Sequence, residues 1–112
     1  MKFLSIYKSV ERGVPPSQEE MSRMGQLIEK EMKAGTLLAT EGCLPSALGA
    51  RVRISGGKLT VTDGPFTEAK ELVGGFMIVA AESSERAVQV AREMPGMTPG
   101  ASIEIREIVG PS

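Results

Sequence analysis

Histidine is absent from the 112-residue sequence, and Cys43 is its only cysteine. Without imidazole, neither a Ser-His-Asp nor a Cys-His catalytic group can form within the chain. Zinc sites built on imidazole are excluded as well, and one thiolate cannot make a cysteine cage. Any acid–base chemistry must use Asp, Glu, Lys, Tyr or Cys. One cysteine allows no intrachain disulfide, which fits a reducing compartment. The sequence also shows no loop of closely spaced oxygen ligands for a divalent cation, so we expect no metal and no cofactor.

Aromatic residues are scarce too, at 4%, and the formal net charge is only −1. The chain thus lacks both the stacking platform and the positive field of a nucleic-acid-binding protein. Its apolar runs are far shorter than the roughly 20 residues that span a bilayer. Lys8 and Glu11 interrupt the apolar start too soon for a signal peptide. We expect one globular domain over residues 1–112, cytoplasmic, with no nucleic-acid or membrane partner.

Two helices are predicted from caps and apolar spacing. Ser17-Gln18-Glu19-Glu20 fits a capping box, and Gly35 can end the helix that follows. Ser83 or Ser84 can cap a second helix, which Pro95-Gly96 stops. The apolar stripe of the first helix comprises Met21, Met24, Leu27, Ile28 and Met32. The buried side of the second comprises Ala87, Val88, Val90, Ala91 and Met94.

Strands are predicted at residues 3–7, 36–41, 51–54, 58–62, 75–81 and 103–106. The third and fourth form a hairpin around Gly56-Gly57. With the two helices, the order is that of a ferredoxin-like βαββαβ fold of the α+β class with an inserted β-hairpin. Right-handed crossovers would place both helices on one face of the sheet. Residues 75–81 are nevertheless apolar on both faces, so the bare face needs a cover, and we predict a homodimer.

One run of residues resembles a known family. Thr62-Asp63-Gly64-Pro65-Phe66-Thr67-Glu68-Ala69-Lys70-Glu71, followed by Gly74-Gly75-Phe76, is similar to the signature of the YCII-related family in its DGPF-domain branch. Further matches are Glu41-Gly42, Arg53 and Ile103-Glu104-Ile105-Arg106.

The resemblance implies a dimeric α+β barrel, in which the sheets of two copies face each other, and a cleft between sheet and helices for a small molecule. Function in this branch is largely unassigned. Some relatives are encoded beside extracytoplasmic-function sigma factors. A His–Asp pair was suggested for the wider family, but this chain has no histidine to form it.

Asp63 is the main candidate for chemistry. It ends the fourth predicted strand, where a carboxylate that faces a cleft could act as a general base or bind a polar group of a ligand. The alternative is turn chemistry, in which Asp bonds following amides, Gly supplies an unusual φ and Pro fixes the next residue. Both interpretations stay open at this point.

Four further residues are candidates for ligand binding. Arg53 can hold a carboxylate or phosphate, or belong to a salt-bridged exterior. Glu41 can be a second acid near Asp63 if the second strand lies beside the hairpin. Tyr7 offers a hydroxyl at the end of the first strand, or packs with a wet tip. Phe66 follows the turn and either anchors the loop or contacts a ligand.

These features leave two hypotheses. The first is a small-molecule enzyme, such as a cofactor-free lyase or isomerase, with Asp63 as base and Arg53 orienting an anion. The second is a non-catalytic dimeric module that binds a ligand or regulates, with a link to sigma-factor regulation. The absence of histidine weakens the first hypothesis only.

Overall fold

The computed structural model describes residues 1–11, 15–95 and 99–110. Its elements are β1 (Lys2–Ser9), α1 (Gln18–Lys33), β2 (Leu37–Gly42), the 3-10 helix η1 (Ser46–Leu48), β3 (Ala50–Ser55), β4 (Lys58–Asp63), β5 (Leu72–Ala80), α2 (Ser84–Arg92) and β6 (Ser102–Glu107). Within the described residues, neither helix has the length and hydropathy needed to cross a membrane.

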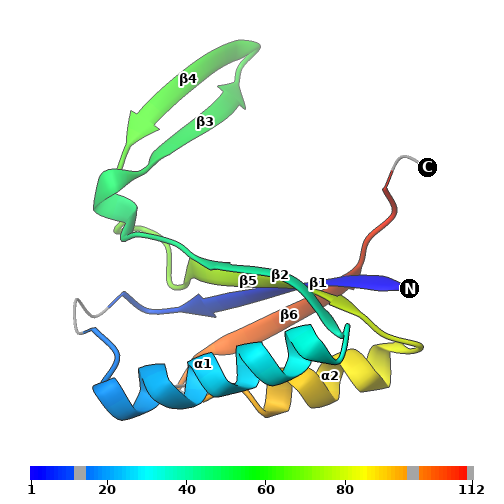
Figure 1. Ribbon diagram of the computed structural model, residues 1–112. Helices are drawn as coiled ribbons and strands as arrows, with labels where there is room; N and C mark the ends of the chain where they lie inside the picture. The colour runs from blue at the N-terminus through cyan, green and yellow to red at the C-terminus, as the bar shows by residue number, and fades with distance from the viewer. Residues whose placement is uncertain (12–14, 96–98, 111–112) are drawn as a thin grey trace.

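A four-stranded sheet with the order β2-β5-β1-β6 forms the centre of the fold. Every neighbouring pair in it is antiparallel. Both helices lie on one face of this sheet, as Figure 1 shows. The chain is therefore an α+β protein with two helices and antiparallel sheets, and this arrangement is compatible with the predicted ferredoxin-like fold.

The caps explain where both helices begin. The Ser17 hydroxyl accepts a hydrogen bond from the Glu20 amide at 3.1 Å, and the Ser83 hydroxyl accepts one from the Arg86 amide at 3.3 Å. Each bond satisfies one amide that has no partner within its helix. After α1, Gly35 takes a φ of +77°, the conformation predicted for it.

The core lies between the sheet and α2. Val90 of α2 packs with Leu37, Met77 and Val79 of the sheet. In contrast, α1 contributes only Ile28 to this cluster as a half-buried neighbour. The predicted stripe of α1 is only partly correct: Met21 and Met32 are 61% and 46% exposed. Val88 of α2, predicted to be buried, is also exposed, at 36%.

The sheet has a covered face and an open face. Ser5 and Met77 stand opposite each other in β1 and β5, and both are buried towards the helices. Their neighbours along the strands point the other way, because successive side chains alternate between faces. The open face therefore carries a half-buried apolar group of side chains: Leu4, Ile6, Phe76 and Ile78.

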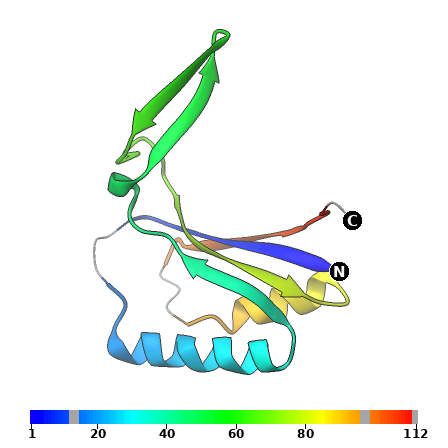
Figure 2. The same cartoon turned by 45° about the horizontal axis from the view of Figure 1, so that its top comes forward.

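β3 and β4 form a separate two-stranded sheet between β2 and β5 in the chain. We call this hairpin, residues 50–63, the arm. It turns through Gly56 and Gly57, whose φ angles of +58° and +79° suit a tight hairpin turn. Figures 1 and 2 show that the arm rises from the side of the sheet opposite the helices and projects away from the rest of the molecule.

Candidate functional site

A cavity of about 460 Å³ lies between the covered face of the sheet and the helices. Most of its wall is apolar. The residues that line it are Ser5, Tyr7, Pro16, Glu20, Met21, Met24, Ile28, Thr40, Glu41, Gly42, Gly74, Gly75, Phe76, Met77, Met94, Pro95 and Ile103. A volume of this size, with an apolar wall and a few polar groups, is typical of a small-molecule site.

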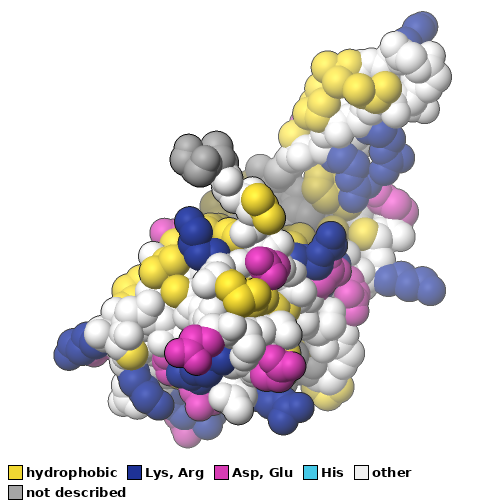
Figure 3. Space-filling model, turned by 90° about the vertical axis from the view of Figure 1, so that its right-hand side faces the viewer, with side chains coloured by type: hydrophobic (Ala, Val, Ile, Leu, Met, Phe, Trp, Pro, Cys, Tyr) yellow, Lys and Arg dark blue, Asp and Glu magenta, His cyan; other side chains and the backbone are white. Residues whose placement is uncertain are grey.

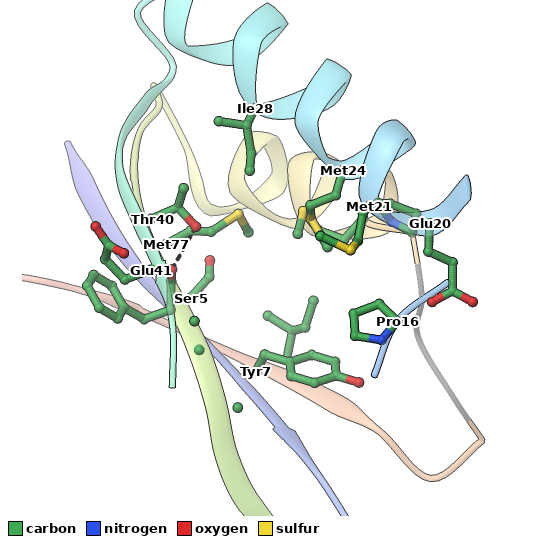
Figure 4. Close-up of a pocket in the computed structure, with 17 residues that line it drawn as sticks. Ser5, Tyr7, Pro16, Glu20, Met21, Met24, Ile28, Thr40, Glu41 and Met77 are labelled. Carbon is green, nitrogen blue, oxygen red and sulfur yellow. Dashed lines mark hydrogen bonds between the residues drawn. The ribbon is translucent and has the colours of Figure 1, made fainter. Parts of the chain in front are cut away.

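Ser5 is the most unusual residue of this wall. Its side chain is 1% exposed, and its hydroxyl oxygen is buried without a hydrogen-bond partner among the described residues. Figure 4 shows the side chain at the inner part of the cavity, beside Met77. A buried hydroxyl without a partner costs about 1–3 kcal/mol. A ligand that offers a hydrogen-bonding group at this point would recover that cost.

Thr40 lies on the far side of Met77 from Ser5, because β5 separates β2 from β1, and its hydroxyl is already partly engaged. Its hydroxyl donates to the Phe76 carbonyl oxygen at 3.0 Å, so it retains acceptor capacity but has no further proton to donate. The inner end of the cavity therefore holds two hydroxyl groups, of which only the Ser5 hydroxyl has a proton free to donate.

A pair of glycines shapes the floor of the cavity. β1 and β5 change register between Tyr7 and Lys8, which marks a β-bulge at Gly74. A Cβ at Gly74 would lie 2.9 Å from the Tyr7 ring, and one at Gly75 would lie 2.8 Å from the Glu41 carbonyl oxygen. The two glycines thus let the Tyr7 ring lie against β5 and let β2 approach it closely.

The roof of the cavity comes from α1. Met21 and Met24 point from the helix towards the opening above Tyr7, and Ile28 points into the cavity on the side of Met77, as Figure 4 shows. Methionine is flexible and polarizable, and so adapts to ligands of different shape. Near the end of α1, Glu31 is the buried residue of the helix, at 2% exposure. Its carboxylate lies 3.6 Å from the guanidinium of Arg86 in α2.

The predicted site residues fall into two groups. Tyr7 and Glu41 both line the cavity. The Tyr7 hydroxyl points towards Pro16, whereas the Glu41 carboxylate points away from the centre of the cavity (Figure 4). Arg53 and Asp63 are exposed and belong to the arm, and neither lines the cavity. β2 pairs with β5 and not with the arm, so strand pairing does not bring Glu41 and Asp63 together.

The turn after Asp63 is held by its backbone. The Gly64 amide donates to the Gly49 carbonyl oxygen at 2.9 Å. A Cβ at Gly64 would lie 1.7 Å from the carbonyl oxygen of Ser46 in η1, so no larger residue fits there. These contacts explain the glycine of the Asp-Gly-Pro run as a packing requirement at the base of the arm. They assign no role to the Asp63 carboxylate, whose part in chemistry stays a prediction.

Phe66 anchors the same base. The Arg51 guanidinium lies 4.2 Å from the centre of its ring and also pairs with Glu68. The hydrogen bond from Arg51 holds the pKa of the Glu68 carboxyl below its usual range. Together with Leu48, Arg51 and Phe66 line a second, more open hollow of about 640 Å³. Arg51 is therefore held by contacts within the fold, and the predicted ligand contact of Arg53 stays a prediction.

The described residues hold no cluster of three or more His, Cys, Asp or Glu side chains that could bind a metal ion. Among the described residues that line the cavity, none is Lys or Arg. The ionisable side chains in its wall are those of Tyr7, Glu20 and Glu41. This set of groups suits a neutral, largely apolar molecule better than an anion, which the two carboxylates would repel.

The fold and the cavity define an α+β domain with a ligand-sized space between its sheet and its helices. Residues 1–110 match the model of the YCII-related domain, and the chain belongs to this family. It is also similar to the uncharacterized protein R00369 of Rhizobium meliloti (strain 1021). The two are 32% identical over 97 residues, which cover 82% of this chain and 78% of that protein. The predicted family is thereby confirmed.

Proposed function

We propose that the chain binds a small, largely apolar molecule in the cavity between the sheet and the helices. The observation that carries this proposal is the unpartnered Ser5 hydroxyl in the wall of a 460 Å³ cavity. Buried polar groups in folded proteins are nearly always hydrogen-bonded, so an exception calls for an explanation. A ligand that accepts or donates one hydrogen bond there supplies it.

The ligand that fits best is a ring or short chain with one polar group at its inner end. Ser5 would meet this polar group, and Met24, Ile28 and Met77 would pack on the apolar part. The Tyr7 hydroxyl and the Glu20 carboxylate stand nearer Pro16 and can meet a second polar group at the outer end (Figure 4). This placement moves the proposed site from Asp63, where the sequence suggested it, to the covered face of the sheet.

We further propose that the binding unit is a homodimer, with the open faces of two sheets packed together as in the dimeric α+β barrels. The half-buried apolar side chains of that face, Leu4, Ile6, Phe76 and Ile78, support this packing. A second copy would cover them at the spacing of about 10 Å that separates packed sheets. We also propose that the arm is a hairpin inserted into the ferredoxin-like plan. The run at residues 62–71 supports the further proposal that the chain belongs to the DGPF branch of the family.

Binding alone suits a regulatory module, and binding with conversion suits a cofactor-free enzyme. For an enzyme of this type, the acid or base must touch the ligand. Tyr7 and Glu20 meet this requirement in the cavity, whereas the Glu41 carboxylate points away from its centre. Asp63 meets the requirement only if a ligand or a second copy reaches the arm. The cavity supports the binding module first, and the lyase or isomerase activity and the sigma-factor link stay predictions.

A thermal-shift screen of neutral metabolites on three proteins tests the proposal. A ligand at a hundred times its dissociation constant stabilises the wild type by roughly 2.7 kcal/mol, which such a screen detects easily. A ligand of the cavity loses most of this shift with Ser5→Ala and keeps it with Asp63→Asn. The reverse pattern would place the site at Asp63 and contradict the proposal. Incubating the ligand with the wild type and measuring its conversion then separates an enzyme from a binding module.

A further inference from the structure

The arm has two different faces. Val52 pairs with Val61 and Ile54 pairs with Leu59 across its two strands, so these four side chains share one face. Each of the four is between 62% and 75% exposed. The other face carries Arg51, Arg53, Thr60 and Thr62. Figure 3 shows hydrophobic side chains along one side of the projecting arm and basic side chains along the other.

An isolated two-stranded hairpin is only marginally stable in water, because it has no core. β3 and β4 contact chiefly each other. The described contacts that tie the arm to the rest of the chain lie at its base, between Arg51, Phe66 and Glu68. The apolar face beyond this base has no cover within the described residues. A separate surface is therefore needed to hold the outer part of the arm in place.

The shape of the chain supports the same conclusion. Its radius of gyration is 15.8 Å. A compact domain of this length is expected to have a radius of gyration of about 13 Å. The difference is in the direction that a projecting arm would produce.

We infer that the apolar face of the arm packs against a second copy of this chain, in the homodimer proposed above, on which this inference rests. The arm and the open face of the sheet lie on the same side of the molecule (Figure 1). Each arm strand has six residues, which span about 20 Å. Two stacked sheets lie only about 10 Å apart. An arm that rises from one open face thus extends past the level of the partner's sheet.

The partner is a second copy, because one closed symmetric interface would then cover both apolar surfaces. Homodimers with a two-fold axis use the same surface on each chain. The arm of each copy would pack against the other copy. The apolar face of the arm would lie in the interface, and the face with Arg51 and Arg53 would remain towards water.

Two double substitutions, one on each face of the arm, test the inference. Val52→Thr with Val61→Thr keeps the branched shape that strands favour, but places unpaired hydroxyl groups in the interface. The dimer dissociation constant should rise at least roughly 100-fold, measured by sedimentation velocity over a dilution series. Thr60→Ser with Thr62→Ser, on the other face of the same strand, should leave the dissociation constant unchanged.

Hydrogen exchange on the wild type gives a second readout that needs no variant. The inter-strand amides of β3 and β4 should be protected at concentrations where the chain is dimeric. They should exchange rapidly when the chain is diluted to monomer, because the free hairpin is only marginally stable. Protection that does not change on dilution would overturn the inference, as would rapid exchange in the dimer.

The outcomes separate this inference from the proposed function. A monomeric wild type would overturn the homodimer and the arm interface together. A dimeric wild type whose dissociation constant does not respond to Val52→Thr with Val61→Thr would overturn the arm interface alone. A wild-type arm that binds phosphatidylglycerol vesicles in place of a second copy would overturn it as well. Ligand binding in the cavity survives all three results, because no residue of β3 or β4 lines it.

Discussion

Replacing Ser5 with alanine should stabilise the unliganded protein. The Ser5 hydroxyl is buried at 1% exposure and has no hydrogen-bond partner among the described residues. Its removal relieves a desolvation cost of about 1–3 kcal/mol and leaves a small void that takes back part of the gain. We expect the free energy of unfolding to rise by about 1 kcal/mol. At the usual unfolding entropy per residue, this is about 4 °C in Tm for a chain of 112 residues.

Urea denaturation measures this change directly. Wild type and Ser5→Ala are compared at the same protein concentration, because a dimer's stability depends on concentration. Ser9→Ala, at the end of the same strand, is the matched control and should change stability by less than about 0.5 kcal/mol. A stabilised Ser5→Ala that no longer responds to a ligand would show that the hydroxyl is kept for binding at a cost in stability. If Ser5→Ala lowers the free energy of unfolding by 1 kcal/mol or more, the hydroxyl has a structural partner, and the reasoning fails.

Four further predictions concern the rest of the fold. Gly64→Ala should lower the free energy of unfolding by about 3 kcal/mol in urea denaturation, since its Cβ would collide with a backbone carbonyl. Gly25→Ala, with open space around it inside α1, should raise it by about 0.5–1 kcal/mol. Two cationic neighbours hold the pKa of Glu104 below its ordinary value of 4.5. The stability that these two neighbours supply is present above pH 4.5 and is lost as the pH falls through the lowered pKa. The free energies of unfolding of the wild type and of Glu104→Gln should therefore become equal in acid. Arg86→Met should cost about 3 kcal/mol because it leaves Glu31 buried without its partner, and adding Glu31→Leu in a double-mutant cycle should recover most of this loss.

The sequence was a good guide to the elements of the fold. The Ser17 cap, the glycine after α1, the hairpin around Gly56-Gly57 and the end of β4 at Asp63 all depend on local backbone chemistry. Such chemistry can be recognised from a few neighbouring residues. The two helices and the antiparallel strands then followed from hydrophobic periodicity.

The burial of α1 was harder to predict. Apolar spacing suggested that Met21 and Met32 are buried, but both are largely exposed, and the acidic Glu31 is buried instead. Periodicity gives the face of a helix that packs, but not how closely the helix approaches the sheet. α1 approaches loosely near its start, and the cavity fills the space between. Only the distance between α1 and the sheet, which lie far apart in the sequence, could have shown that a cavity separates them.

The resemblance implied a cleft between sheet and helices, and the predicted Tyr7 and Glu41 line the cavity there, but the inner end of the candidate site at Ser5 was missed for a similar reason. Ser5 stands in β1 at an inward position, between Phe3 and Tyr7 on the same face, and a polar residue there was the one available signal. Asp63 drew attention because it sits in the run that identifies the family. The structure explains Gly64 of that run by packing against η1. A run of residues that carries a family resemblance can thus mark a backbone requirement and lie apart from the cavity between the sheet and the helices.

The central claim is that the space between the sheet and the helices receives a small apolar molecule. The chain has seven methionines, and several of them line this space. In a protein labelled with ¹³C at the methionine methyl groups, phenol can be titrated as a ring with a single hydroxyl. The resonances of Met24, Met77 and Met94 should shift together in a saturable way, and those of Met1 and Met32, outside the cavity, should stay in place. Shifts confined to Met1 and Met32, or no shift of the lining methionines at saturating phenol, would contradict the claim.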